Sequence, residues 1–255
     1  MKLENINTAK AQEYINAIYS RRSVLSNYYG QPMEENDKYF ETNDTFVLAK
    51  PVGDFFRIYI ASNEKKELVE LLSGLKGTNV INFPTKSDIQ DIDAIMTESG
   101  YKQIGVYERF VYNVKNLTGG DVISKIEFAS AADEEEIYNL YSGWKEFSPY
   151  TDWLPMHEEL KEFIENKSVI INKQNDKIVG VNICPVIGAI MNLRLIIDLS
   201  GGGIKLMNAM FDMAWKKGIK LCRWWVNSQN ERAIGFYGRL GAIPDGLRDY
   251  TYMKR

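Results

Sequence analysis

The sequence predicts an α/β (α+β) protein in which two tandem domains repeat one order of helices and strands. Two observations lead to this prediction. Apolar runs of strand length alternate with amphipathic helical segments along the 255 residues, which is enough chain for two domains of ordinary size. In addition, the segments around Gly100 and Gly241 align without a gap, because each glycine closes a helical segment and precedes a strand that carries tyrosines.

The N-terminal half is expected to begin with a helix whose N-cap is Thr8 and whose apolar face carries Ile15 and Ile18. A Pro-Val-Gly-Asp turn at 51–54 separates the first two strands. The expected elements are a helix at 8–26, strands at 45–50 and 55–61, a helix at 62–73, a strand at 79–83, a helix at 87–99 and a strand at 104–114.

The C-terminal half repeats this order after a linker, the run Asn-Leu-Thr-Gly-Gly at 116–120. We therefore place the domains at 1–116 and 121–255. The expected elements are a strand at 122–128, a helix at 131–142, an irregular or helical aromatic-rich segment at 144–164, strands at 168–172, 177–184 and 190–197, a helix at 202–217, a strand at 220–226, a helix at 229–240 and a strand at 247–253.

Composition and charge exclude several classes of partner. The net charge is −3, and no clustered basic excess suggests nucleic acid or an anionic membrane surface as a partner. The first residues are polar, and no apolar run approaches the ~20 residues that span a bilayer. Cys184 and Cys222 lie in apolar runs, and buried thiols fit a reduced cytoplasm, so we expect a cytoplasmic location. We also expect a monomer or a homodimer. The only histidine is His157, and we expect no metal site.

The most informative segment is an apolar strand that runs into three glycines and then into an amphipathic helix, between Asn192 and Met207. Glycines at such a junction let backbone N–H groups turn toward one point without obstruction by Cβ atoms. The helix N-terminus adds a partial positive charge of about half a unit. The segment therefore predicts an anion site suited to a phosphate or diphosphate. The alternative is a glycine-rich turn that binds no ligand.

A second segment carries the pattern Asn-x-x-Ala-x-x-Phe-Tyr-x-x-Leu-Gly at 230–241, between two strands. This pattern resembles the C-terminal motif of the GNAT superfamily of acetyl-CoA-dependent N-acetyltransferases. The upstream glycines resemble that family's loop for the CoA diphosphate, Arg/Gln-x-x-Gly-x-Gly/Ala. The resemblance covers 122–255, and it covers the N-terminal half only in element order and in the closing helix and strand. It implies tandem GNAT-like domains, each with a mixed, mostly antiparallel twisted sheet flanked by helices.

The resemblance implies transfer of an acetyl group from acetyl-CoA, as a co-substrate, to a primary amine of a small molecule or peptide through a tetrahedral intermediate. Tyr237 matches the tyrosine that commonly protonates the departing thiolate, and its phenol, with a reference pKa near 10, carries the proton at neutral pH. An ordinary core position is the alternative for Tyr237. Asn230 would touch the cofactor or cap its helix.

The expected cofactor-binding residues lie at the strand end, where an N–H would meet the oxyanion, and along the loop that follows. They are Leu195, Ile196, Ile197, Ser200, Gly201, Gly202, Gly203, Ile204, Lys205 and Asn230. Ser200 stands where the family usually has Arg or Gln, and Lys205 where it has Gly or Ala. The lysine would add charge toward the phosphates or narrow the site.

The general base is left open among acidic residues and a histidine in the segment that shapes the acceptor pocket in the family. They are Asp152, His157, Glu158 and Glu159. The reference pKa of a histidine suits the role best, so His157 is the candidate, and a water relay or a structural histidine is the alternative. The aromatic residues Trp144, Phe147, Tyr150 and Trp153 would form a wall of that pocket or a plain hydrophobic lid.

The N-terminal half lacks these features. The corresponding junction reads Ala-Ser-Asn-Glu-Lys-Lys at 61–66, with no glycine and an acidic residue at the helix start, and Met96 stands where Tyr237 does. We therefore expect an inactive copy without a CoA loop. Two other functions stay open. One is a non-catalytic module that binds CoA or another ligand, and the other is an aminoacyl-tRNA-dependent transferase, which the acidic chain disfavours.

Overall fold

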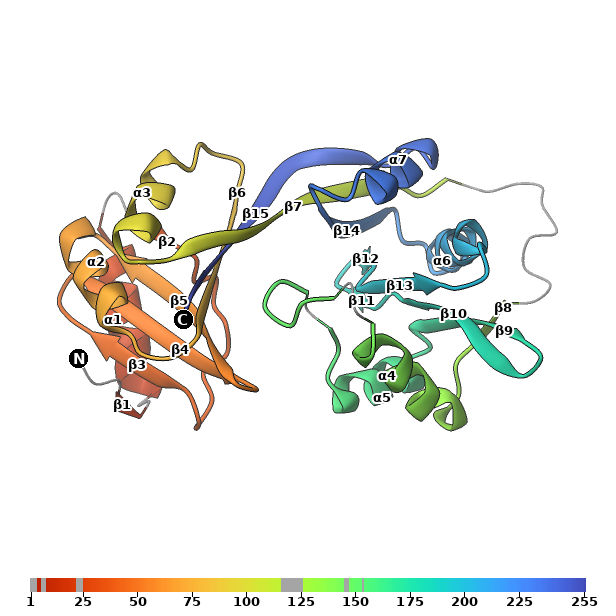
Figure 1. Ribbon diagram of the computed structural model, residues 1–255, viewed down its shortest axis with the longest axis horizontal. Helices are drawn as coiled ribbons and strands as arrows, with labels where there is room; N and C mark the ends of the chain where they lie inside the picture. The colour runs from red at the N-terminus through yellow and green to blue at the C-terminus, as the bar shows by residue number, and fades with distance from the viewer. Residues whose placement is uncertain (1–3, 6–7, 22–24, 116–125, 145–146, 153) are drawn as a thin grey trace. The chain divides into compact units, whose positions relative to one another are not determined.

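The computed structural model describes residues 4–5, 8–21, 25–115, 126–144, 147–152 and 154–255. The chain forms two compact units, the first made of residues 1–107 and 247–255 and the second of residues 108–246. Figure 1 labels the elements of both. The predicted fold class is confirmed, because mixed, mostly antiparallel sheets are flanked by helices. No helix in the described part of the chain has both the length and the apolar character needed to cross a bilayer.

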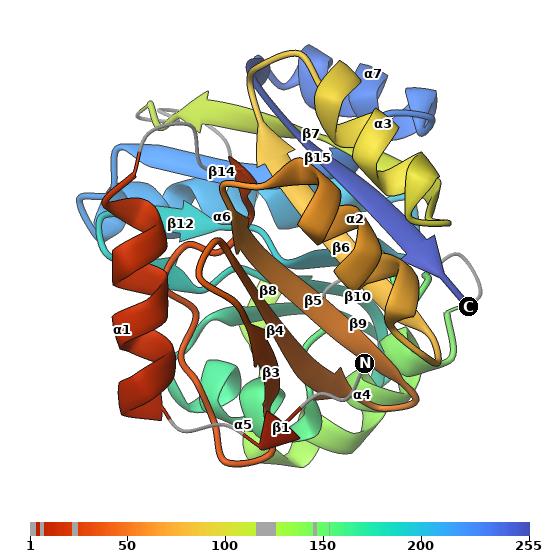
Figure 2. The same cartoon turned by 90° about the vertical axis from the view of Figure 1, so that its left-hand side faces the viewer.

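The first unit is built on a sheet with the strand order β1-β3-β4-β5-β6-β15. Neighbouring strands pair antiparallel, except that β5 and β6 are parallel. Helix α1 covers one face, and helices α2 and α3 cover the other (Figure 2). The elements are β1 (Glu4–Asn5), α1 (Thr8–Tyr19), β2 (Leu25–Ser26), β3 (Lys38–Glu41), β4 (Thr45–Val52), β5 (Phe55–Ser62), α2 (Lys65–Gly74), β6 (Asn79–Thr85), α3 (Gln90–Glu98) and β7 (Lys102–Asn113).

The residues of β5 account for this two-sided core. Ile58 and Ile60 are buried with the apolar side chains of α2 and α3. Tyr59 and Ala61 are buried with those of α1. Successive side chains of a strand point to opposite faces, so the four successive apolar positions at 58–61 require a cover on both sides.

The second unit contains two sheets. One has the order β13-β10-β9-β8 and is antiparallel, and the other has the order β7-β14-β12-β11. Helices α4 and α5 pack on the first sheet, while α6 contacts strands of both. The elements are β8 (Ile126–Phe128), the 3-10 helix η1 (Ala131–Asp133), α4 (Glu134–Ser142), α5 (His157–Glu165), β9 (Val169–Gln174), β10 (Lys177–Ile183), β11 (Val186–Ile187), β12 (Ile190–Asn192), β13 (Leu195–Asp198), α6 (Gly203–Lys216), β14 (Leu221–Asn227), α7 (Glu231–Arg239) and β15 (Ile243–Lys254).

The two helix ends that predicted a repeat have the same backbone geometry. Gly100 has a φ of 82° and Gly241 a φ of 87°, a conformation that glycine adopts without steric cost. In both cases the next residue donates its N–H to a carbonyl of the helix. These bonds are Tyr101 to Met96 at 2.8 Å and Ala242 to Tyr237 at 3.1 Å. The turn from helix to strand therefore has the same backbone conformation and the same kind of hydrogen bond in both halves.

Several element boundaries differ from the sequence predictions, and strand pairing explains two of the differences. Helix α1 ends at Tyr19 rather than at residue 26, because residues 25–26 pair with β5 as strand β2. The strand predicted at 190–197 is divided into β12 and β13, which pair with different neighbours.

The compact units also do not follow the predicted domain boundary. The predicted linker at 116–120 lies outside the described residues, and the units change at 107–108 and at 246–247 instead. The last strand explains this difference, since residues 248–254 of β15 pair with 79–85 of β6 and complete the sheet of the first unit. Strands β7 and β15 thus each begin in one unit and end in the other, which a boundary drawn from the repeat does not anticipate.

Candidate active site

The strand that leads to the glycine loop changes its partner halfway. Its first part, β12, pairs in parallel with β14, and the last bond of this kind runs from the N–H of Leu193 to the carbonyl of Arg223 at 3.0 Å. The next residue, Arg194, donates its N–H to the carbonyl of Ile183 in β10 at 2.8 Å. From there β13 pairs antiparallel with β10 as far as Asp198. The strand therefore separates from β14 before it reaches the loop.

The loop gathers N–H groups around one point, and that point holds a carboxylate of the chain itself. The carboxylate of Asp198 accepts from the Ser200 N–H at 3.0 Å, the Ser200 hydroxyl at 2.9 Å and the Gly203 N–H at 2.8 Å. Burial by itself would raise the pKa of Asp198, but these bonds and one from Gly202 lower it below its usual range. The loop thus binds an oxyanion group, and Asp198 fills the place that the sequence analysis gave to a diphosphate.

Two of the three glycines are favoured by this arrangement. Gly201 has a φ of 75°, which favours glycine. A Cβ atom at Gly202 would lie 3.2 Å from the Ser200 hydroxyl oxygen, which is a tight contact. One at Gly203 would lie 3.6 Å from an Asp198 carboxylate oxygen and 3.8 Å from the ring of Phe236, which are ordinary van der Waals contacts.

The other expected cofactor residues are spread over different environments. The side chains of Leu195 and Ile197 are buried in the core beneath α4 and α5, whereas Ile196 packs on the core around α6. Ile204 and Lys205 are exposed on the first turn of α6. Asn230 caps α7, since its Oδ1 accepts from the Ala233 N–H at 2.9 Å.

Tyr237 lies on the inner face of α7 and is only 7% exposed. Its ring packs against Trp224, Phe236 and Phe110, with centroids 5.0, 5.3 and 6.2 Å away. Burial raises the pKa of its phenol above the usual value. The side chain therefore has the contacts of a core tyrosine, and its phenol stays protonated at neutral pH.

His157 stands at the start of α5 and faces α4. Its Nε2 lies 2.9 Å from a carboxylate oxygen of Glu134, and its ring meets that of Tyr138 edge-on at 4.6 Å. The histidine belongs with the α4 and α5 side of the unit, whereas Tyr237 is in the core around α6. The structure gives no contact between these two predicted catalytic residues.

The other predicted base candidates and aromatic residues have local roles. Asp152 accepts from the Ser148 N–H at 2.7 Å and Glu159 from the Met156 N–H at 3.1 Å, while Glu158 is exposed. Among the aromatic residues, Trp144 and Phe147 pack on the core beneath α4 and α5, Tyr150 is half-buried and Trp153 lies outside the described residues.

Sequence reasoning missed a polar group on the outer face of β14. Arg223 donates its Nε to the Asn192 Oδ1 at 2.6 Å, next to the point where the strands separate. Arg109 bonds to Asp245 at 2.5 and 2.9 Å and lies over the ring of Trp225. Burial and then the charge of Arg109 lower the pKa of Arg223. The alternation of buried and outward residues along 221–227 was the signal that could have located this face.

No protein-family model matches this sequence, and a search of curated proteins gives no match. Solved structures do match. A GNAT-family acetyltransferase from Colwellia psychrerythraea has a TM-score of 0.60 and 15% identity, with 100% of both chains covered. A GCN5-related N-acetyltransferase from Sphaerobacter thermophilus has a TM-score of 0.61 and 13% identity over 83% of this chain and 76% of that one. A tandem GNAT protein of clavulanic acid biosynthesis has a TM-score of 0.57 and 9% identity over 99% and 98%.

The fold is that of the tandem GNAT proteins. The resemblance predicted from the motif at 230–241 and from the glycine loop is thereby confirmed for the fold. At identities of 9–15% these likenesses establish architecture, so function has to be argued from the site.

Proposed function

We propose that the second unit is an N-acyltransferase that moves an acetyl group from acetyl-CoA to a primary amine. The observation that carries the proposal is the change of partner at Leu193 and Arg194, which separates β13 from β14 and leads β13 into an amide-lined turn at the start of α6. In acetyl-CoA the thioester carbonyl stands at one end of a long arm and the diphosphate at the other. The separated strand β13 suits the carbonyl, and the amide-lined turn at the start of α6 suits the diphosphate.

The carboxylate of Asp198 supports the anion-binding part of the proposal and also limits it. Its bonds to Ser200 and Gly203 show which donors the turn offers to an oxyanion. Because a diphosphate and a carboxylate cannot occupy the same donors, binding of acetyl-CoA requires that Asp198 move outward. Asp198 is half-buried at the end of β13, and a side-chain rotation would release the donors. We therefore expect weaker CoA binding than an empty turn would give.

The chemistry assigned to Tyr237 is proton donation to the departing thiolate. Its raised pKa keeps the proton on the phenol at neutral pH, so the phenol is available as a donor, and complete transfer to a free thiolate is uphill. His157 is assigned as the base for the amine. Glu134 engages its Nε2, so the base would act through Nδ1. Either residue must come closer to the reacting atoms than its present contacts place it.

A second candidate function is a non-catalytic module that binds CoA or another ligand. Two observations favour it. Asp198 occupies the anion site, and Tyr237 has the surroundings of a core residue.

One experiment separates the two functions. Acetyl-CoA binding is measured by calorimetry for the wild type and for Asp198→Asn, which removes the charge and keeps an oxygen acceptor. The proposal predicts binding in both proteins, about tenfold tighter in the variant because one like charge is gone. Release of free thiol is then followed with a panel of amines. Binding with thiol release supports the acyltransferase, and binding without release from any amine supports the module. If neither protein binds acetyl-CoA, then CoA is not a ligand of this protein.

A further inference from the structure

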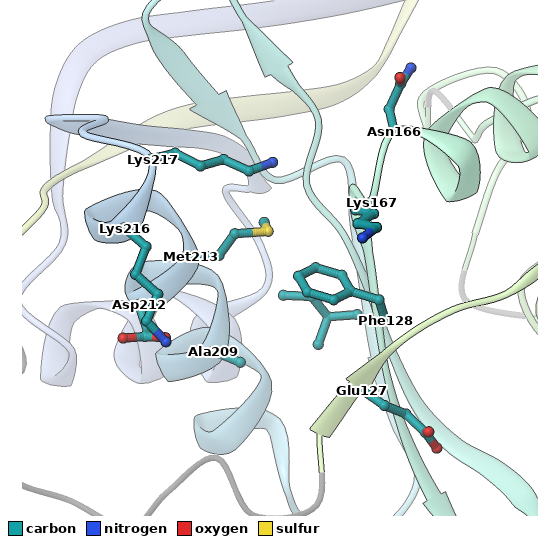
Figure 3. A pocket seen from close by; sticks show the side chains of 10 residues that line it. Glu127, Phe128, Asn166, Lys167, Ala209, Asp212, Met213, Lys216 and Lys217 are labelled. Carbon is teal, nitrogen blue, oxygen red and sulfur yellow. The ribbon is translucent and has the colours of Figure 1, made fainter.

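A cavity of about 410 Å³ lies in the second unit, between α6 and the strands β8 and β9. Its volume falls in the range of small-molecule sites, about 300 to 1,000 Å³. Figure 3 shows the residues that line it. The lining residues are Glu127, Phe128, Asn166, Lys167, Ile170, Ala209, Asp212, Met213, Lys216 and Lys217. These residues come from β8, the turn after α5, β9, and the middle and C-terminal end of α6, away from the glycine loop at the other end of α6.

The floor of the cavity is apolar. Ile170, Ala209 and Met213 are at most 7% exposed, so they are already packed against the core on one side. Phe128 is 46% exposed, which is high for a phenylalanine, and Figure 3 places its ring opposite Met213. An aliphatic chain that enters the cavity would cover this ring and gain about 25 cal/mol for each Å² of apolar surface removed from water.

The rim is charged, and its charges are not all neutralised. Lys216 pairs with Asp212 at 2.6 Å on the outer side of α6, and Glu127 lies 3.9 Å from Lys173. In the described part of the chain Lys167 and Lys217 form no salt bridge. Their side chains come from different walls, Lys217 from the end of α6 and Lys167 from the turn after α5 (Figure 3). Two lysines without a salt bridge therefore line the cavity beside its apolar floor.

The backbone of Lys167 is unusual. Its φ is 50°, a left-handed conformation in which glycine or asparagine normally closes a helix. A lysine here costs conformational energy, and the conformation closes helix α5, because the Lys167 N–H donates to the Ile164 carbonyl at 3.0 Å and the Ser168 N–H to the Phe163 carbonyl at 2.8 Å. The turn places the Lys167 side chain among the residues that line the cavity.

We propose that this cavity binds a monocarboxylate with an unbranched aliphatic chain of medium length. The chain would lie on Phe128 and Met213, and the carboxylate would accept from the ammonium groups of Lys167 and Lys217. A single negative charge fits better than a phosphate dianion, because Glu127 and Asp212 stand on the same rim. This site is independent of the proposed acyl transfer.

The test is calorimetric titration of the full-length protein with octanoate, with octan-1-ol and octylammonium as matched probes that lack or reverse the charge. We expect octanoate to bind and both probes to bind at least tenfold more weakly. Lys217→Gln and Lys167→Gly should each weaken octanoate binding about tenfold, the effect of losing one charge-assisted hydrogen bond. Lys161→Gln removes the same charge from an exposed position on α5 outside the cavity and should change nothing.

Lys167→Gly provides the sharpest readout, because it relieves the backbone and should leave the melting temperature unchanged or higher while binding falls. Ala209→Trp would fill the cavity and abolish binding, provided that circular dichroism shows a folded protein. Gly203→Asp should leave octanoate binding intact, which separates this site from the CoA proposal. The inference is overturned if octanoate does not bind, if octan-1-ol binds equally well, or if the two lysine variants bind octanoate as the wild type does.

Discussion

Both units contain a parallel strand pair that separates before the next helix begins, and they fill the separation differently. In the first unit β5 and β6 pair in parallel only over Phe56–Ile58 and then separate, as β12 and β14 do in the second. The buried side chain of Asn27 bridges this separation. It donates to the carbonyls of Ile58 and Asn82 at 3.0 and 2.9 Å and accepts from the Ile60 N–H at 2.6 Å. In the second unit the strand after the separation ends in a turn whose donors Asp198 engages.

The helices that follow these strands also differ. In the first unit the helix start is capped by Glu64, which accepts one bond, from the Lys66 N–H at 3.2 Å. In the second unit Asp198 accepts two N–H bonds of 3.0 and 2.8 Å and one hydroxyl bond of 2.9 Å. Glycines make the difference, since only they let several N–H groups turn toward one point. The comparison teaches that the helix start of the first unit makes one bond to a carboxylate, whereas that of the second gathers three donors around the carboxylate of Asp198.

The largest effect is expected from opening the bridge in the first unit. Asn27→Leu would leave the Ile60 N–H and the carbonyls of Ile58 and Asn82 without their partner in a buried place. We expect the free energy of unfolding to fall by about 3 to 9 kcal/mol, at roughly 1 to 3 kcal/mol for each of the three unsatisfied groups. Urea denaturation followed by circular dichroism measures this loss. Asn43→Leu, at an exposed position of the same unit, is the control and should change stability by less than about 0.5 kcal/mol. A small effect at Asn27 would mean that water replaces the bridge.

The next prediction compares α7 of the second unit with α3, the helix at the corresponding position of the first unit. Tyr237→Phe should lower turnover by about ten- to a thousandfold, the range that a general acid supplies, and leave acetyl-CoA binding unchanged. Thiol release with an amine identified in the panel measures turnover. The matched variant Met96→Leu, at the corresponding position of the first unit, should leave turnover as it is. If Tyr237→Phe turns over as fast as the wild type, the phenol is only a core residue and the two helices are functionally alike.

A third prediction uses a carboxyl group of the first unit. Burial raises the pKa of Asp249 to about 6, and hydrogen bonding from Asn82 and the charge of Arg57 only partly oppose this. Because the folded state holds the proton more tightly than the unfolded state, Asp249 stabilises the fold at low pH and loses this contribution as the pH rises through about 6. Asp249→Asn should therefore raise stability by about 1 to 3 kcal/mol at pH 8 and leave it nearly unchanged at pH 4. Urea denaturation at both values checks the difference, and an equal effect at both would contradict the raised pKa.

The architecture was largely predictable, because it depends on patterns within single segments. The glycine-closed helix ends at Gly100 and Gly241 and the glycine loop at 201–203 gave the repeat and the helix starts directly. The exchange of β7 and β15 between the units was not predictable, since pairing of β15 with β6 joins residues more than 150 positions apart. The role of Asp198 was hidden for a related reason. A carboxylate before a glycine loop reads as a strand end, and only the folded turn shows that it points back at the N–H groups.

The smallest losses of stability are expected from substitutions at the starts of α2 and α6. The ratio of these two losses tests the comparison most directly. Glu64→Ala removes one exposed cap bond, so we expect a loss of about 0.5 kcal/mol. Asp198→Ala removes the acceptor of three bonds, so we expect about 1 to 2 kcal/mol at low phosphate. Adding inorganic diphosphate should restore part of the loss in Asp198→Ala, because the freed donors then have an external anion, and it should do nothing for Glu64→Ala. Thermal melts with and without diphosphate measure both. If diphosphate raises the melting temperature of neither variant, the turn accepts its own carboxylate and no other anion. The two units would then be alike in lacking a CoA site.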